Sequence, residues 1–132
     1  MIKRYVKGAQ AERDLCKKLK ELGFALIRAA GSGGSISTPD LVAIKKGRIL
    51  AFECKAWKTT PRLKKQEYED FNEWCEIAGA MGFLAWKNKQ WKFLEVKDIP
   101  KTNINKDGIN FKDLMFIINI WGVNCEFIGN RR

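Results

Sequence analysis

The sequence predicts one α/β domain in which helices flank a central mixed sheet of five strands. The first observation is the order of its patterned segments, which is helix, three strands, helix, two strands and helix. The second is the presence of two short turn sequences, each between two apolar runs, as in β-hairpins. The third is the length of 132 residues with 45% hydrophobic content, which supports a core without disulfide or metal staples. We therefore expect residues 1–132 to form a single domain.

The first helix is expected over residues 5–22, and Gly23 ends it. Its apolar residues recur at helical spacing, at Leu15, Cys16, Leu19 and Leu22. Glu12 lies on the same face, where an acidic side chain is costly unless it is paired or binds a cation. The alternative is that Glu12 lies at the margin of this face, near the start of the helix, where the helix dipole favours acidic residues. A separate stripe forms a solvated basic face that suits a phosphate backbone: Arg13, Lys17 and Lys20.

Three strands are expected next, over residues 24–30, 40–45 and 48–56. Arg28 is the only charged residue of the first strand, and it either extends outward or holds a phosphate or carboxylate. The second and third strands form a hairpin around Lys46-Gly47. The apolar run of the third strand predicts burial on both faces, which is typical of a central position in the sheet.

The second half of the chain is expected to contain two more helices and a second hairpin. The elements are, in order, a basic loop (57–65), a helix (67–80), two strands (82–86 and 90–96), a polar surface loop (100–110), a helix (111–121) and a short strand (123–128). The aromatic-rich stripes of these two helices are explained mostly by core packing. A self-association surface on part of them is the alternative.

Asp40, Glu53 and Lys55 form the candidate site on the central hairpin. Side chains alternate along a strand, so Glu53 and Lys55 point to one face and Cys54 to the other. Two carboxylates and a lysine are thereby placed on neighbouring strands, as a divalent metal and an activated water require. Acidic residues on strand edges are also common without any catalytic role, so this short pattern is weak by itself.

The composition limits the classes of catalysis and the classes of binding partner that the protein can have. The net charge of +10 favours a polyanion, most often nucleic acid, over a membrane surface, and a basic protein without such a partner is the remaining alternative. The absence of histidine excludes Ser-His-Asp and Cys-His catalysis and imidazole-based zinc sites. The four cysteines are widely spaced and are expected to be free thiols. No apolar segment follows the basic N-terminus, so we expect an intracellular, cytoplasmic protein without a signal peptide.

Four segments carry a resemblance to a known family. They are K-G-A-Q-A-E-R-D-L (Lys7 to Leu15), G-F-A-L-I-R-A-A-G-S (Gly23 to Ser32), P-D-L-V-A (Pro39 to Ala43) and F-E-C-K (Phe52 to Lys55). Together they resemble archaeal-type Holliday junction resolvases, within the PD-(D/E)xK nuclease superfamily. The resemblance is dense over residues 4–57, weaker but colinear to Val96, and faint after Pro100. It implies a restriction-endonuclease-like core and a structure-specific endodeoxyribonuclease that resolves four-way DNA junctions by paired nicking in recombination and repair.

The resemblance also implies the roles of individual residues. Metal-binding carboxylates fall on Glu12, Asp40 and Glu53, with the backbone carbonyl of Cys54 as a further ligand. The catalytic lysine falls on Lys55, and a loop serine, also assigned to the catalytic residues, falls on Ser32. Arg13 and Arg28 correspond to DNA-contacting arginines, and we extend the expected DNA-binding surface to Arg4, Lys7, Lys58 and Arg62. The loop after Ser32 departs from the family because residues 33–37 carry no charge. We expect a mobile loop there that closes over DNA, with the basic loop of residues 57–65 compensating for the missing charges.

The expected cofactor is one or two Mg²⁺ ions, with Mn²⁺ as a substitute, and no small-molecule cofactor. The expected partners are four-way junction DNA and a second copy of the chain, because two symmetric nicks call for a C2 homodimer. We place the interface on the second helix, at Phe71, Trp74 and Ala78. Two alternatives stay open: a restriction-like or repair endonuclease on the same core, and a DNA-binding module without activity. Cellular and viral sources are equally compatible with the sequence.

Overall fold

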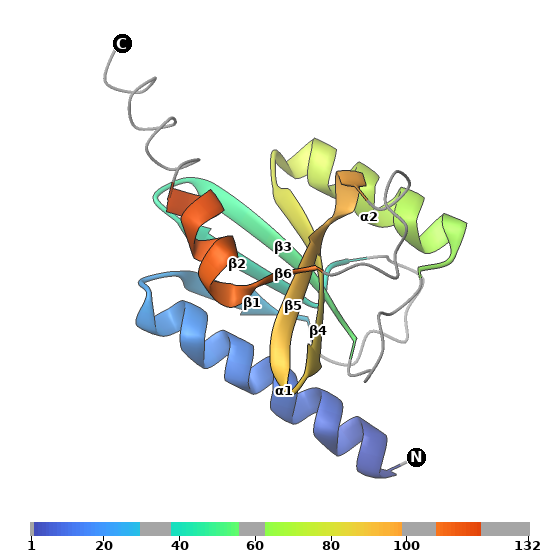
Figure 1. Cartoon of the computed structure of the whole chain (residues 1–132). Helices are drawn as coiled ribbons and strands as arrows, with labels where there is room; N and C mark the ends of the chain where they lie inside the picture. Colours follow the sequence, from blue (N-terminus) through green and yellow to red (C-terminus); the bar gives the residue numbers. More distant parts are fainter. Residues whose placement is uncertain (1, 30–37, 56–62, 99–107, 120–132) are drawn as a thin grey trace.

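The computed structural model describes residues 2–29, 38–55, 63–98 and 108–119, drawn in colour in Figure 1. Within these ranges, the side chains of residues 2–9, 88 and 98 are not described. In chain order, its elements are α1 (Ile2–Glu21), β1 (Ala25–Arg28), β2 (Leu41–Lys45), β3 (Arg48–Lys55), α2 (Lys65–Ala78), β4 (Met81–Asn88), β5 (Gln90–Glu95), the short 3-10 helix η1 (Val96–Asp98), β6 (Ile109–Asn110) and a helix over residues 111–119.

One mixed sheet contains all six described strands, in the order β1-β2-β3-β4-β5-β6. Neighbouring strands are antiparallel except for β3 and β4, which are parallel. Parallel neighbours need a crossover connection, and α2 lies within it. The α/β class and the five predicted strands are confirmed.

The sheet has a sixth strand, β6, in the segment that the sequence predicts as a surface loop. Its two residues pair with β5, in the register Phe93↔Ile109 and Lys92↔Asn110. Two residues are too few to produce an alternating pattern, so the strand depends on its partner and leaves no sequence signal. The strand predicted over residues 123–128 lies outside the described residues.

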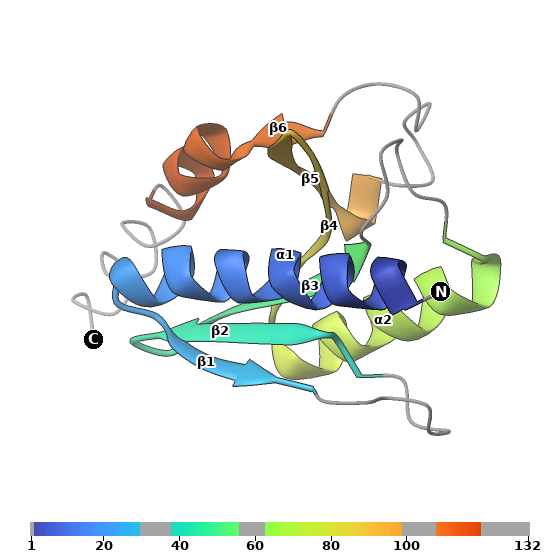
Figure 2. The same cartoon turned by 90° about the horizontal axis from the view of Figure 1, so that it is seen from below.

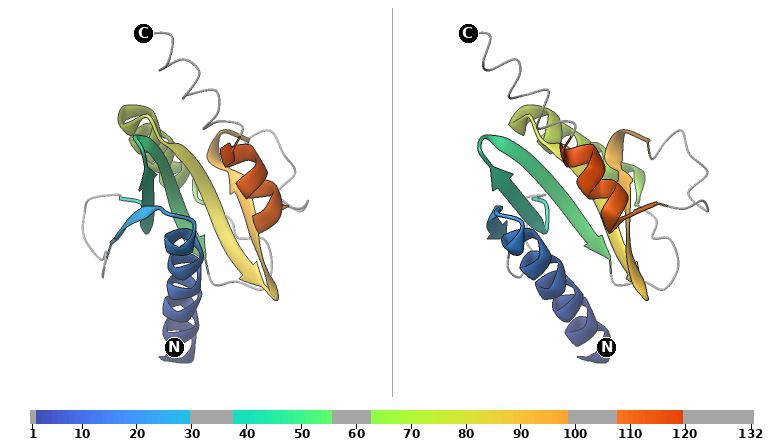
Figure 3. Two further views of the ribbon diagram at one scale, coloured as in Figure 1. Left: turned by 90° about the vertical axis from the view of Figure 1, so that its left-hand side faces the viewer. Right: turned by 60° about the vertical axis from the view of Figure 1, so that its left-hand side comes forward.

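The helices cover both faces of the sheet. On one face, α1 packs against β1, β2 and β3 (Figure 2). Leu15 and Leu19 of α1 share a buried cluster with Leu114 and Ile118 of the helix over residues 111–119. On the other face, Phe71 and Cys75 of α2 form a second cluster with apolar residues of β3, β4 and β5. Figure 3 shows α1 and the helix of residues 111–119 in front of the sheet, with α2 behind it.

The centre of the sheet is β3, as its apolar run predicts. Leu50, Ala51 and Phe52 are all 0% exposed, although they alternate between the two faces. The hairpin to β2 pairs Lys45 with Arg48 across a two-residue turn. Both turn residues have positive φ, 50° at Lys46 and 81° at Gly47, as a turn that matches the twist of the strands requires. This hairpin fixes the register of β2 and β3 and therefore the relative position of the candidate site residues.

The helix α2 begins at Lys65, two residues earlier than the sequence predicts. The carboxylate of Glu67 accepts a hydrogen bond from the backbone N–H of Lys64 at 3.2 Å, which satisfies a donor at the helix start. The helix ends at Gly79, whose φ of 69° belongs to the left-handed region that terminates helices. Both ends of α2 are thus set by local signals.

Phe71 corrects one prediction about α2. The sequence places it on a dimer interface, whereas its side chain is 4% exposed and lies in the core beneath the helix. Trp74 is half-buried against the same core, and Ala78 is half-buried. The apolar stripe of α2 is therefore mainly core packing, because the crossover helix has to cover the sheet.

Among the described helices, none is long and apolar enough to cross a membrane.

Candidate active site

Asp40 and the last residues of β3 lie side by side, where the start of β2 meets the end of β3. Asp40 directly precedes β2, whose first residue, Leu41, pairs with Phe52 of β3. The Oδ2 atom of Asp40 accepts a hydrogen bond from the backbone N–H of Cys54 at 2.8 Å. This bond fixes the carboxylate against the strand that carries Glu53 and Lys55. The predicted juxtaposition on neighbouring strands is confirmed.

The site draws on both faces of the sheet. Cys54 packs on the side of α1, and Ala51, which shares a face with Glu53 and Lys55, packs on the side of α2. Glu12 reaches the site from α1, and one potential ligand atom each of Glu12, Asp40 and Cys54 lies within 4.8 Å of the others. Asp40 also lies close enough to Glu53 to raise the pKa of its carboxyl group. It is therefore next to residues on both sides of the sheet.

Glu53 resists ionisation in this environment. Burial, then the hydrogen bond to Asp40 and its negative charge, raise the pKa of Glu53 to about 9, while Lys55 acts in the opposite direction. Such crowded carboxyl groups can ionise together only when a positive charge is present. Carboxylate oxygens are the ligands that hard divalent cations prefer. The residues at this edge therefore fit a divalent metal ion.

Glu12 makes an ion pair with Arg28 and also lies close to Asp40 and Cys54. Its Oε2 atom accepts hydrogen bonds from Nε and Nη2 of Arg28, at 3.2 and 3.1 Å. Burial raises the pKa of Glu12, and the bond from Arg28 partly offsets this effect. Of the two roles left open for Glu12, the inward-facing, paired one is confirmed. Arg28 holds a carboxylate rather than extending freely into solvent.

Lys55 lies between the site and the start of α2. Its Nζ atom is 3.6 Å from Oε2 of Glu67, and the two side chains are 25% and 43% exposed. Glu67 is a residue that the sequence interpretation missed, because it is one of several acidic residues on α2. The signal that identifies it is its position three residues after Lys64, at the start of a helix, where glutamate completes a capping arrangement.

The predicted DNA-binding residues are only partly described. Arg13 is exposed, as are Lys17 and Lys20 of the same basic stripe. Arg4 and Lys7 lie in α1, but their side chains are not described, and Lys58 and Arg62 lie outside the described residues. The predicted catalytic residue Ser32 also lies outside them. Their roles stay predictions.

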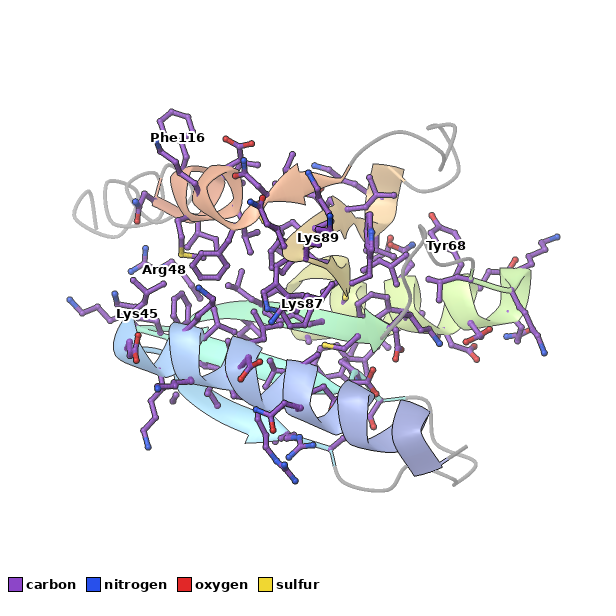
Figure 4. All side chains as sticks on the ribbon, turned by 60° about the horizontal axis from the view of Figure 1, so that its bottom comes forward. Lys45, Arg48, Tyr68, Lys87, Lys89 and Phe116 are labelled. Atoms are coloured by element: carbon purple, nitrogen blue, oxygen red, sulfur yellow. The ribbon has the colours of Figure 1, made fainter. Side chains whose placement is uncertain are left out.

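The β4–β5 hairpin brings Lys87 beside α1. Figure 4 shows Lys87 and Lys89 at this hairpin. Lys87 makes an ion pair with Asp14 of α1 at 3.5 Å. The pair joins the hairpin to the helix that carries Glu12 and Arg13.

Comparison with known proteins gives the family. The family model described as archaeal Holliday junction resolvase (Hjc) matches residues 3–119. The crossover junction endodeoxyribonuclease Hjc of Sulfolobus acidocaldarius is 32% identical over 123 residues, which cover 83% of this chain and 86% of that protein. The Hjc protein of Archaeoglobus fulgidus is 39% identical over 103 residues, 75% of this chain and 76% of that protein. That of Methanocaldococcus jannaschii is 42% identical over 85 residues, 64% of this chain and 61% of that protein.

The fold is similar as well. The 1.6 Å structure of Archaeoglobus fulgidus Hjc, a Holliday junction resolvase from an archaeal hyperthermophile, matches with a TM-score of 0.63 and 33% identity. The match covers 80% of this chain and 89% of that one. The family model includes α1, the whole sheet and the helix of residues 111–119, and therefore all the described site residues. The chain belongs to the archaeal Holliday junction resolvase family.

Proposed function

We propose that this protein is a metal-dependent endodeoxyribonuclease that resolves four-way DNA junctions by paired nicking. The observation that carries the proposal is the site itself. Asp40, Glu53 and Lys55 converge at one edge of the sheet, with Glu12 beside them, in a chain of the resolvase family. The set is intact, which argues against a DNA-binding module without activity.

The cation we expect is Mg²⁺, with Mn²⁺ as a substitute. Glu12, Asp40, Glu53 and the backbone carbonyl of Cys54 would hold it. When bound, a divalent metal polarises a phosphoryl oxygen and lowers the pKa of a bound water molecule. The thiol of Cys54 is a poor ligand for a hard cation, so we assign the carbonyl rather than the sulfur to this role.

The side chains perform the remaining tasks. The ammonium group of Lys55 offsets charge on the scissile phosphate and orients the attacking water. Arg13, exposed on α1, binds the phosphate backbone, and Arg28 holds Glu12 in place. Two copies of the chain in a C2 dimer would present two such sites to the two strands that must be nicked.

Cleavage of matched DNA substrates tests the proposal. We expect a four-way junction to be nicked at symmetric positions in the presence of Mg²⁺, and linear duplex and single strands to be cleaved far more slowly at the same salt concentration. Equal cleavage of linear duplex would favour a restriction-like or repair endonuclease. No cleavage with Mg²⁺ or Mn²⁺ would favour a binding module.

Glu53→Gln tests the site. We expect this substitution to abolish cleavage and to leave junction affinity within about threefold, because many phosphate contacts contribute to binding. Gel-shift titration and cleavage of the same labelled junction measure the two effects. Cleavage at the wild-type rate in this variant would refute the site assignment.

A further inference from the structure

Lys55 needs a partner that fixes its position. Lysine has a long side chain with considerable rotamer freedom, so an ammonium group that must face one phosphate is not positioned by the strand alone. Alternation along β3 directs the side chains of Glu53 and Lys55 to the side on which Ala51 packs with α2. The positive charge of Lys55 lowers the pKa of Glu53, so the two groups are close enough to interact.

Glu67 is suited to fix it because its two carboxylate oxygens have different partners. Oε1 accepts the backbone N–H of Lys64 at 3.2 Å, and Oε2 lies 3.6 Å from Nζ of Lys55. The first contact ties the carboxylate to the start of α2. The second therefore holds the ammonium group relative to a rigid element rather than to another mobile side chain.

The charge of Glu67 also reaches the centre of the site. Its negative charge contributes to the raised pKa of Glu53, after the larger effects of burial, Asp40 and Lys55. Among the described residues, the group whose atoms are close enough to hold one metal ion contains neither Glu67 nor Glu53. The role of Glu67 therefore rests on its contact with Lys55, whose Nζ atom lies 3.6 Å from its Oε2 atom.

We propose that Glu67 is a positioning residue for cleavage, which acts by holding the ammonium group of Lys55 between Glu53 and the scissile phosphate. The inference rests on the proposed function, because it assigns Lys55 to the reaction. The competing role is purely structural, in which Glu67 only caps α2 and the ion pair contributes little, as exposed pairs often do.

Glu67→Gln separates the two roles. Glutamine keeps a carbonyl oxygen for the N–H of Lys64 and removes the charge that holds Lys55. We expect an unchanged melting temperature, unchanged junction affinity and a single-turnover cleavage rate that is roughly tenfold lower, since misplacing a reacting group is costly. Glu67→Ala should lower the melting temperature as well, because the cap is lost too.

Glu69→Gln is the matched control. Glu69 lies on the same helix and makes an ion pair with Lys65 at 4.0 Å, with side chains 50% and 90% exposed. The substitution removes the same negative charge from α2, but at a residue whose ion pair is with Lys65 rather than Lys55. We expect wild-type cleavage in this variant, so that a general effect of the charge of α2 on DNA binding is distinguished from positioning.

The environment of the Lys55 side chain can also be measured by NMR, without a cleavage assay. The side-chain methylene carbons of Lys55, assigned by comparison with Lys55→Arg, should shift in the NMR spectrum of Glu67→Gln and stay unchanged in Glu69→Gln. If Glu67→Gln cleaves at the wild-type rate, or Lys55 gives the same signals, the positioning role is wrong although the nuclease proposal stands. If the wild-type protein cleaves no junction, both proposals fail.

Discussion

Glu53 is the residue in which the electrostatics of the site are most visible. Its pKa in the folded protein is about 9, against an ordinary value of 4.5. A group whose pKa is raised on folding stabilises the fold fully below its unfolded-state pKa and loses this contribution as the pH rises towards the folded-state value. The metal-free protein should therefore become less stable between about pH 4.5 and pH 9.

Urea unfolding at several pH values without metal checks this prediction. The loss should be at most about 1.4 kcal/mol per pH unit for one proton. Glu53→Gln should flatten the profile, because an amide does not ionise, and added Mg²⁺ should reduce the slope by stabilising the ionised form. A profile that is identical in the wild type and in Glu53→Gln would contradict the assignment of the effect to this residue.

Loss of Arg13 should mainly weaken junction binding, whereas loss of Arg28 should mainly lower the cleavage rate. Arg13 is exposed, so Arg13→Ala should weaken junction binding and reduce the salt dependence of the affinity by about one counterion. Arg28 holds Glu12 through two hydrogen bonds to one oxygen. Arg28→Ala should therefore lower the cleavage rate more than the affinity. Fluorescence anisotropy and single-turnover cleavage on the same junction measure both, and equal effects of the two substitutions would refute the distinction.

At the scale of elements, the packing of α2 on β4 depends on a glycine. A Cβ atom at Gly82 would lie 2.5 Å from Sγ of Cys75 and 3.0 Å from Cγ1 of Val96. Gly82→Ala should destabilise the protein by about 1–3 kcal/mol, the usual cost of overpacking a core. Cys75→Ala, which removes the obstructing sulfur, should recover part of this loss in the double variant. Additive losses in urea unfolding would contradict a direct clash.

The elements that were predicted correctly are those with strong local signals. The hairpin at Lys46-Gly47 has a glycine where positive φ is required, and β3 has a long apolar run. The alternation along β3 also predicted that Glu53 and Lys55 share a face. The sequence could not show that this face is covered by α2, because that depends on the parallel crossover from β3 to β4. For the same reason Glu67 was missed and Phe71 was assigned to the surface.

For the whole molecule, the proposed C2 dimer remains the main prediction. The burial of Phe71 changes how it should be tested, because Phe71→Asp would place a charge in the core and unfold the protein. Exposed apolar residues are the better probes. Ile77 of α2 is 80% exposed, and Phe116, in the helix of residues 111–119, is 65% exposed. The two residues lie on helices that cover opposite faces of the sheet.

Ile77→Asp and Phe116→Asp form a matched pair. If α2 builds the interface, Ile77→Asp should be monomeric, because a charge would be buried against the partner, whereas Phe116→Asp should stay dimeric. Neither substitution alters the core of one chain, so circular dichroism should show both variants folded. Light scattering gives the mass of each. A dimeric Ile77→Asp together with a monomeric Phe116→Asp would move the interface to the other face, and a monomeric wild type would contradict the dimer.

A monomer should also make single nicks without the paired second cut, because only one site would then be held on each junction.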